Sequence, residues 1–320
     1  MSNRLQGRVA LVTGAGGGIG RAEALALAAE GARVVVNDIG TSVTGVEGQA
    51  SRTPAEEVVA EIGQAGGEAV PNFDSVADHK AAERMIQATL DAFGRLDILV
   101  NNAGVLQEQM VWKISDEQWD REHGVHLKGA FNTIKFAAQL FRQQKSGRIV
   151  NTASPAGLGA MGHASYASAK EGVVGLTRTV AKDLGRYGVT CNAIRPAART
   201  RMTVNPDLEA NLERMREMRT RPGQFADPML EEIVLAGEGL KADLFHPGNV
   251  AAFVVWLCTD AARRINGRTF FVGGDRIALY SEPTAKSVLC NDGPWALDAL
   301  DALFDASFLS DDMNPNAPEQ

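Results

Sequence analysis

The sequence predicts an α/β protein built on a doubly wound parallel sheet of about seven strands with helices on both faces. Short apolar runs alternate along the chain with longer segments of helical periodicity. The apolar runs lack polar alternation, which is expected of strands covered by helices on both sides. Regular alternation of the two patterns indicates parallel strands joined by crossover helices.

The predicted strands are residues 9–12, 33–36, 69–72, 98–100, 148–150, 189–194 and 269–272. The clearest predicted helices are residues 21–31, 55–66 and 80–93. No repeat or linker composition divides the chain, so we expect a single dinucleotide-binding domain over residues 1–320. Within it we expect a substrate lid at about residues 197–247 and a C-terminal extension at about residues 276–320.

Composition narrows the class of function. Of the 320 residues, 45% are hydrophobic, and the formal net charge is −7. An acidic chain lacks the basic footprint that nucleic-acid binding requires. No apolar run approaches the roughly 20 residues that span a bilayer, and the first residues lack a signal-peptide core. We therefore expect a cytoplasmic protein with no nucleic-acid and no membrane partner.

The three cysteines have no spacing that suits a metal ion. Cys191, Cys258 and Cys290 are also too few for a disulfide scaffold. Their simplest interpretation is reduced thiols, and we expect no metal site.

A glycine-rich turn follows the first predicted strand. Thr13-Gly-Ala-Gly-Gly-Gly-Ile-Gly20 leads directly into a predicted helix. Glycines let backbone N–H groups approach a pyrophosphate, and a helix N-terminus offers partial positive charge. We expect Gly14, Gly18, Ile19 and Gly20 to bind a dinucleotide; the alternative is a flexible strand–helix turn.

The second predicted strand ends at Asp38, where a carboxylate can accept hydrogen bonds from ribose hydroxyls and repel a 2′-phosphate. This favours NAD over NADP. Arg33 stands at the wrong end of that strand to bind a phosphate, whereas Arg52 is a weaker argument for NADP. Asp74 and Ser75 follow the third strand, where they would meet the adenine or, equally, cap the next helix.

Three residues have the chemistry of an acid–base site. Tyr166 and Lys170 are four apart and share one face of a helix, and Ser154 precedes the tyrosine by twelve residues. A free tyrosine titrates near pH 10, and lowering its pKa by roughly 2–3 units takes about 3–4 kcal/mol. Lys170 and an oxidised nicotinamide together would supply that stabilisation, so we expect an acidified phenol.

Together these motifs resemble the short-chain dehydrogenase/reductase family over roughly residues 6–275. The likeness rests on the glycine turn, Asn101-Asn-Ala-Gly104, Ser154, Tyr166-x-x-x-Lys170 and Asn192-Ala-Ile-Arg-Pro196. Residues 34–40, 40–48 and 125–129 bring it closer to the dehydrogenase portion of peroxisomal multifunctional enzymes and to bacterial hydroxysteroid and hydroxyacyl-CoA dehydrogenases. The resemblance implies a Rossmann-like fold and a homotetramer or homodimer.

The resemblance also implies residue roles. Tyr166 would be the acid–base, Ser154 would orient the carbonyl, and Lys170 would bind the nicotinamide ribose. The remaining cofactor-binding positions that the resemblance implies are Asn102, Ala103, Gly104, Pro196 and Thr200.

The sequence departs from the family pattern at three places. His126 replaces the usual catalytic asparagine, and either a structural histidine or one that takes part in proton transfer fits there. The serine–tyrosine spacing is one residue short, with Pro155 after the serine. Pro196-Ala197 replaces the usual Pro-Gly.

The proposed reaction is reversible oxidation of a secondary alcohol to a ketone with NAD as cofactor. Leu208, Leu212 and Met215 form an apolar stripe in the expected lid, which favours a bulky lipophilic substrate such as a hydroxysteroid. The equal alternative is a stripe that only packs the lid helices against the body of the protein. Arginines in the same region, Arg199 and Arg201 among them, would instead suit the phosphates of a 3-hydroxyacyl-CoA or simply form a solvated helix face. A non-catalytic NAD-binding scaffold and a hydratase or lyase remain alternatives of other classes.

Overall fold

The computed structural model describes residues 3–45, 52–203, 245–285, 288–291 and 293–303. Within these ranges one sheet has the strand order β3-β2-β1-β4-β5-β6-β7-β8. The strands are β1 (Val9–Thr13), β2 (Arg33–Asn37), β3 (Ala69–Asn72), β4 (Ile98–Asn101), β5 (Gly147–Thr152), β6 (Val189–Ala197), β7 (Thr269–Gly273) and β8 (Arg276–Leu279). All pairs are parallel except β7 with β8. The predicted doubly wound α/β fold is confirmed.

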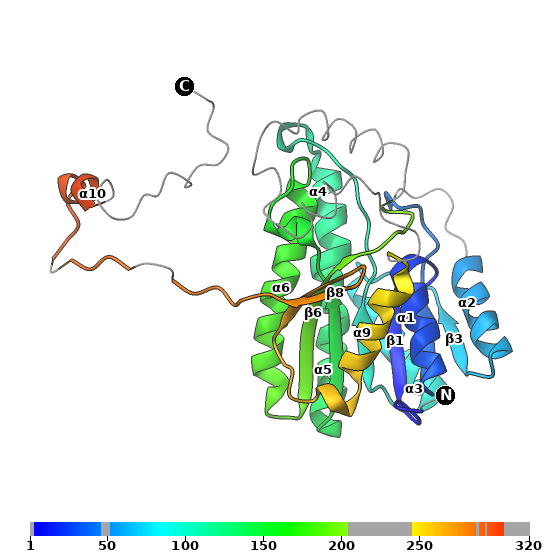
Figure 1. Cartoon of the computed structure of the whole chain (residues 1–320). Coiled ribbons are helices and arrows are strands. Elements are labelled where there is room, and N and C mark those ends of the chain that lie inside the picture. The colour runs from blue at the N-terminus through cyan, green and yellow to red at the C-terminus, as the bar shows by residue number, and fades with distance from the viewer. Residues whose placement is uncertain (1–2, 46–51, 204–244, 286–287, 292, 304–320) are drawn as a thin grey trace.

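Helices pack on both faces of this sheet (Figure 1). One face is covered by α1 (Gly18–Ala29), α2 (Thr53–Gln64) and α9 (Pro247–Cys258), and the other by α3 (His79–Phe93), α5 (Gly129–Gln144) and α6 (Ala164–Gly185). Two further helices lie outside these layers, α4 (Asp116–His123) and α10 (Leu297–Leu303). Alternate residues of β1 serve two cores: Ala10 and Val12 pack with α1, α2 and α9, while Val9 and Leu11 pack with α3, α5 and α6. Burial on both faces explains the unbroken apolar runs.

The order of the strands reverses between β1 and β4. Strand β1 pairs with β2 on one side and with β4 on the other, so the connections leave in opposite directions. Ligands of open α/β sheets bind at such a switch point, beyond the carboxyl ends of the strands. Thr13 and Asn101 end these two strands, and a functional site is therefore expected beside them.

A buried chain of hydrogen bonds ties β4 and β5 to the helices behind them. Asn101 Nδ2 donates to Asn151 Oδ1 over 2.9 Å, and Asn151 Nδ2 donates to Thr177 Oγ1 on α6 over 2.9 Å. Thr133 Oγ1 on α5 donates to Asn101 Oδ1 over 2.6 Å. Such a chain, with each buried amide satisfied, fixes how the strand ends sit against α5 and α6.

Strand β8 is an addition that the sequence patterns did not predict. It forms an antiparallel hairpin with β7 through Gly274, whose φ of 60° suits glycine. Three of its four residues are exposed, so it lacks the apolar run of a central strand. Beyond it the chain leaves the body, and α10 lies apart from the sheet (Figure 1).

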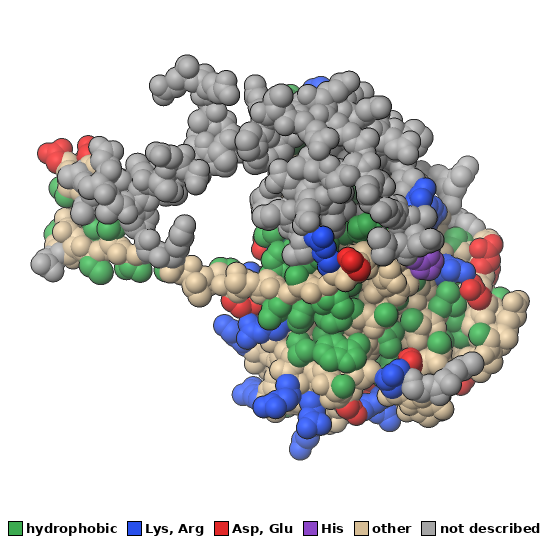
Figure 2. Space-filling view, in the orientation of Figure 1, with side chains coloured by type: hydrophobic (Ala, Val, Ile, Leu, Met, Phe, Trp, Pro, Cys, Tyr) green, Lys and Arg blue, Asp and Glu red, His purple; other side chains and the backbone are tan. Residues whose placement is uncertain are grey.

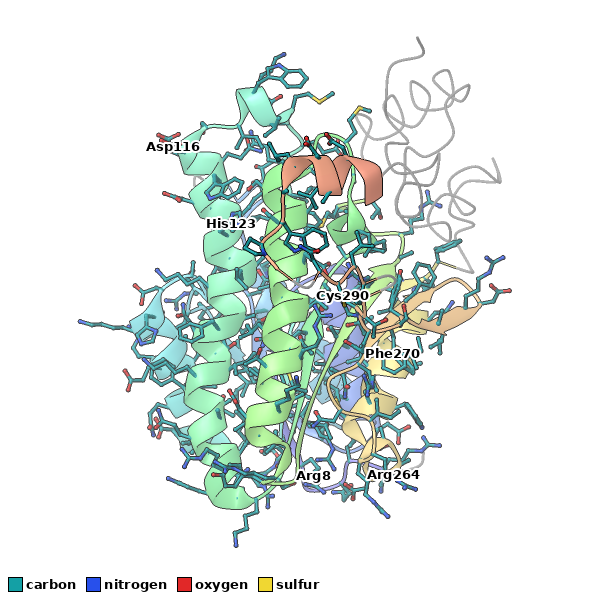
Figure 3. All side chains as sticks on the ribbon, turned by 90° about the vertical axis from the view of Figure 1, so that its left-hand side faces the viewer. Arg8, Asp116, His123, Arg264, Phe270 and Cys290 are labelled. Carbon is teal, nitrogen blue, oxygen red and sulfur yellow. The ribbon has the colours of Figure 1, made fainter. Side chains whose placement is uncertain are left out.

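Helix α4 packs on α6 and makes a polar contact with it through His123. His123 lies beside α6 (Figure 3), and its Nε2 is 3.2 Å from Ser168 Oγ. The imidazole also stacks on Trp119 at 4.1 Å between ring centres. The expected lid falls mostly on residues 204–244, outside the described residues, as does the stripe of Leu208, Leu212 and Met215. The single-domain organisation stays a prediction.

Glu23 on α1 is a buried carboxyl group that lowers the stability of the fold when it is ionised. It is 0% exposed, neither of its oxygens has a hydrogen-bond partner, and burial raises the pKa to about 8 from its ordinary value of 4.5. Between these two values the folded state holds a proton that the unfolded state has lost. Stability therefore falls as the pH rises through this window.

Replacing this group gives a test of that cost. Relative to Glu23→Gln, the wild-type protein should lose roughly 2–4 kcal/mol of unfolding free energy between about pH 5 and about pH 8, because up to about 1.4 kcal/mol is lost per pH unit. Urea unfolding at several pH values measures the difference. The exposed Glu57→Gln is the control and should leave the pH profile unchanged. Parallel profiles for wild type and Glu23→Gln would contradict the argument.

Candidate active site

A pocket of about 430 Å³ opens where the carboxyl ends of β1, β2, β4, β5 and β6 meet. The candidate residues from the sequence that line it are Gly14, Gly18, Ile19, Asp38, Asp74, Ser75, Asn102, Ala103, Gly104, His126, Ser154, Tyr166, Lys170, Pro196 and Thr200. Among the site residues expected from the sequence, only Gly20 does not line this pocket. A Cβ at Gly20 would collide with Asn102 Nδ2 and Gly14 O, so this glycine serves close packing beneath the turn.

The glycine turn is held against β4 by Thr13. The Thr13 hydroxyl accepts hydrogen bonds from the backbone N–H of Asn102 at 3.0 Å and of Ala103 at 3.1 Å. Asn102 Nδ2 in turn donates to the carbonyls of Thr13 and Gly14. A Cβ at Gly14, where φ is 64°, would lie 2.7 Å from Ala103 Cα. Asn102 therefore acts on the turn itself, and Thr13 is a supporting residue that the sequence motifs did not single out.

Asp38 is fixed at the end of β2. Its Oδ2 accepts a hydrogen bond from Gly16 N at 2.8 Å, and its Oδ1 accepts one from Gly40 N at 2.6 Å. Arg33 begins β2 at the opposite end of the strand. The guanidinium of Arg52 lies 4.8 Å from the centre of the Phe73 ring and does not line the pocket.

Asp74 and Ser75 line the pocket beyond β3 but do not cap a helix. Asp74 Oδ1 accepts a hydrogen bond from Arg84 Nη2 at 2.7 Å, and Ser75 Oγ accepts one from Ala77 N at 3.3 Å. The cap of α3 is Asp78, whose side chain accepts from Ala81 N. The helix-cap alternative for Asp74 and Ser75 is therefore wrong.

Tyr166 and Lys170 are buried side by side near the start of α6. Lys170 Nζ donates to Thr152 O over 2.7 Å and lies 5.6 Å from the centre of the Tyr166 ring. Ser154 acts on the Tyr166 phenol by favouring its ionised form. Its hydroxyl also caps the short turn Pro155–Leu158, accepting a hydrogen bond from Ala156 N at 3.2 Å. The proline after the serine thus begins a turn whose cap is the serine.

Without a positive charge from a cofactor, the phenol of Tyr166 is not acidified, so the acidified phenol stays a prediction for the complex with an oxidised nicotinamide. Burial raises the pKa of Tyr166 to about 12, although the hydrogen bond from Ser154 opposes the shift. Burial also lowers the pKa of Lys170 to about 7. Both changes have one cause, because removal from water disfavours the charged form of each group.

His126 lies in a π-helical turn, Gly124–Lys128, between α4 and α5. Its Nε2 is 2.6 Å from Val105 O, which places the ring proton on Nε2. Burial, and then the charge of Lys170, hold the pKa of His126 well below its ordinary value. Nδ1 is buried without a hydrogen-bond partner. A cavity of about 10 Å³, room for about one water molecule, is lined by His126, Lys170 and Thr152.

The end of β6 shows how Ala197 replaces a glycine. Ala197 pairs with Gly273 on β7, and a Cβ at Gly273 would lie 2.7 Å from the Ala197 methyl. The space for the Ala197 methyl is thus provided by Gly273, which has no side chain, on the neighbouring strand. Pro196 and Thr200 also line the pocket. Thr200 Cγ2 lies 3.3 Å from the position that a Cβ on Gly18 would take.

Two acidic residues and a histidine near Tyr166 were not predicted. His163 Nε2 is 3.4 Å from Glu108 Oε1, and its Nδ1 is 2.9 Å from Met161 O. Burial opposes protonation, yet these partners raise the pKa of His163 overall. Glu122 is buried and accepts a hydrogen bond from Gln107 N at 2.9 Å. No spacing rule in the sequence connects these positions.

The described ranges contain no group of three or more His, Cys, Asp or Glu side chains that could hold a metal ion. Among the helices of the described residues, none has the length and apolar character needed to cross a bilayer.

Removing the Thr13 hydroxyl tests how the turn is held. Thr13→Val should lower the unfolding free energy by about 1–3 kcal/mol, because two backbone N–H groups lose their acceptor. Thr13→Ser keeps the hydroxyl and should stay within about 1 kcal/mol of wild type. Chemical denaturation measures both variants. Equal stability of the valine and serine variants would contradict this role.

Comparison with known proteins adds an independent observation. A family model described as short chain dehydrogenase matches residues 8–209. Peroxisomal multifunctional enzyme type 2 of Mus musculus is 42% identical over 271 residues, which cover 84% of this chain and 32% of the relative. This chain thus spans about a third of that protein's length.

Two further relatives match over most of their length. Hydroxyacyl-CoA dehydrogenase ChsB1 of Mycobacterium tuberculosis is 38% identical over 307 residues, covering 90% of this chain and 84% of the relative. The crystal structure of a short chain dehydrogenase from Mycobacterium avium has a TM-score of 0.75 and 38% identity, with 94% of each chain covered.

Proposed function

Because the chain belongs to the short-chain dehydrogenase family, whose members are oxidoreductases that typically bind NAD or NADP, we propose that it is an NAD-dependent enzyme interconverting a secondary alcohol and a ketone. One observation carries the proposal. A single pocket unites the glycine turn and Asp38 at one end with Ser154, Tyr166 and Lys170 at the other. That span suits a dinucleotide whose reactive ring meets a small-molecule substrate.

The residues present fit a dinucleotide. The backbone of the turn at Gly14 and Gly18 would approach the pyrophosphate, and Asp38 would accept hydrogen bonds from the adenosine ribose. Asp74 and Ser75 would lie near the adenine, and Lys170 would hold the other ribose. When bound, the oxidised cofactor supplies a hydride acceptor and a positive charge beside Tyr166.

The proton chemistry belongs to Tyr166. In the direction of oxidation, the ionised phenol takes the hydroxyl proton of the alcohol while the carbinol C–H bond breaks with loss of hydride. Ser154 hydrogen-bonds to the same oxygen and orients it, and in the reverse direction both groups stabilise the charge that develops there. Lys170 stabilises the phenolate when it is charged.

We assign His126 a positioning role and not a proton-transferring one. Its neutral ring supports the loop at Val105 through the 2.6 Å contact with the carbonyl. A pKa held well below the ordinary value means that the ring does not gain a proton near neutral pH. Protons could still pass from Lys170 through water in the small cavity that both residues line. Such a relay is compatible with a positioning role for His126, because it does not need the ring to gain a proton.

Phenylalanine at position 166 tests the acid–base assignment. Tyr166→Phe should lower turnover by about 10²–10⁴-fold, because the proton acceptor is lost, and leave NADH binding within about threefold. Steady-state kinetics and NADH fluorescence titration measure the two effects. Tyr187→Phe, just beyond the C-terminal end of α6, is the control. Near-normal turnover of Tyr166→Phe would reject the assignment.

Asp38 is proposed to decide the choice of NAD over NADP. Asp38→Asn removes the negative charge that would repel a 2′-phosphate, so the NAD/NADP ratio of kcat/KM should fall by about tenfold or more. Asp74→Asn, which lies nearer the adenine, serves as the comparison. A ratio that does not change in Asp38→Asn would contradict the NAD assignment.

For the substrate we propose a 3-hydroxyacyl-CoA. The support is the match to hydroxyacyl-CoA dehydrogenase ChsB1 over most of both chains. A hydroxysteroid is the second candidate, favoured by apolar residues that line the substrate end of the pocket, including Leu106, Ala160 and Met202. NADH production from a 3-hydroxyacyl-CoA and from a 17β-hydroxysteroid separates the two. Absence of turnover with any alcohol would instead favour a non-catalytic scaffold.

A homotetramer or homodimer and a cytoplasmic location remain proposals. Figure 2 shows apolar side chains gathered on the face that carries α9 and β8, where Trp256, Ile277 and Leu279 are exposed. Such a surface supports self-association. Because the mouse relative is named as peroxisomal, cell fractionation is needed to place this chain.

A further inference from the structure

Arg201 follows β6 in the sequence but lies against the first turn of α1. Its Nη2 is 3.1 Å from the point where a Cβ on Gly17 would lie, and Cζ and Nε are 3.7 and 3.8 Å from it. The guanidinium also lines the large pocket. We propose that Arg201 is a further dinucleotide-binding residue whose guanidinium binds the pyrophosphate over the N-terminus of α1. This inference rests on the proposed function.

The electrostatics of this helix end require an anion. Gly17 caps α1 without a side chain, and the first turn contains no acidic residue. By contrast, α3 is capped by Asp78, and α4 is capped by Ser115 and has two acidic residues in its first turn. The N-terminus of α1 therefore keeps its partial positive charge. A guanidinium placed there is repelled until a negative group lies between them.

The other arginine at this end of α1 already has a carboxylate partner. Arg21, in the first turn of α1, forms an ion pair with Glu61 on α2. No carboxylate in the described part of the chain forms an ion pair with Arg201. A planar guanidinium binds two phosphate oxygens at once, which suits it to the bridging group of a dinucleotide.

The order of contacts along the turn locates that bridging group. A Cβ at Gly16 would meet Asp38, one at Gly17 would meet Arg201, and one at Gly18 would meet Thr200. Under the proposed function Asp38 marks the adenosine ribose end of the pocket, and the family resemblance assigns Thr200 to the nicotinamide end. Arg201 stands between them, at the place that the two phosphates of a dinucleotide must occupy.

A coenzyme A substrate also carries phosphates, so the test must separate the two sources. Competition against NADH fluorescence should show that Arg201→Gln weakens both NADH and ADP-ribose by about tenfold, which corresponds to about 1.4 kcal/mol. Adenosine, which lacks the pyrophosphate, should bind as it does to wild type. Arg201→Lys keeps the charge but not the paired donors, and it should recover part of the affinity.

The matched control is Arg199→Gln, an exposed arginine two residues earlier that does not line the pocket. Its affinities should equal those of wild type. The tenfold loss should also shrink at high salt, because added ions screen an exposed charge pair. Circular dichroism and the unchanged adenosine affinity report whether Arg201→Gln is folded; if it is not, Arg201→Lys carries the comparison.

Each outcome has a meaning. Equal binding of ADP-ribose by wild type and Arg201→Gln would overturn the inference while leaving the proposed function intact. Equal weakening of adenosine and ADP-ribose would assign Arg201 to the fold instead. If Arg201→Gln weakened only the binding of coenzyme A, Arg201 would contact the substrate and not the dinucleotide. Failure of wild type to bind NADH and ADP-ribose would refute the proposed function itself.

Discussion

Lys170 and Tyr166 lie next to each other where both are removed from water, and neither gains from being charged there. The phenol has a pKa raised to about 12 and the ammonium one lowered to about 7. Ser154 favours the ionised phenol, but burial outweighs this effect, and the hydrogen bond from Lys170 to Thr152 O fixes the position of the ammonium. Chemistry near neutral pH therefore depends on what else enters the pocket. At about 4 Å, one added positive charge would stabilise the phenolate by about 4 kcal/mol, or about three pKa units.

The rest of the structure holds that pocket in place. Reversal of the strand order at β1 and β4 brings their carboxyl ends together, and Thr13 joins the glycine turn to Asn102. The chain of buried amides from Asn101 to Thr177 links the same strand ends to α6, which carries Tyr166 and Lys170. The dinucleotide end and the proton-transfer end are thus parts of one hydrogen-bonded framework.

Sequence patterns predicted the elements whose signals are local. Strands apolar on both faces, the glycine turn and the four-residue spacing of Tyr166 and Lys170 are all legible in short windows. Strand β8 was missed because its exposed residues carry no buried-strand pattern. The shifted pKa values were missed because burial is a property of the assembled fold. Arg201 was assigned either to coenzyme A phosphates or to a solvated helix face, because its neighbour Gly17 is distant in the chain.

The pKa of Tyr166 with and without bound NAD tests the central claim most directly. Difference titration of tyrosinate absorbance, wild type minus Tyr166→Phe, isolates this phenol from the other tyrosines. Without NAD the ionisation should lie at about 12. With NAD bound the ionisation should move to a clearly lower pH, because an added positive charge favours the phenolate. An ionisation that remains at about 12 in the complex would contradict the account.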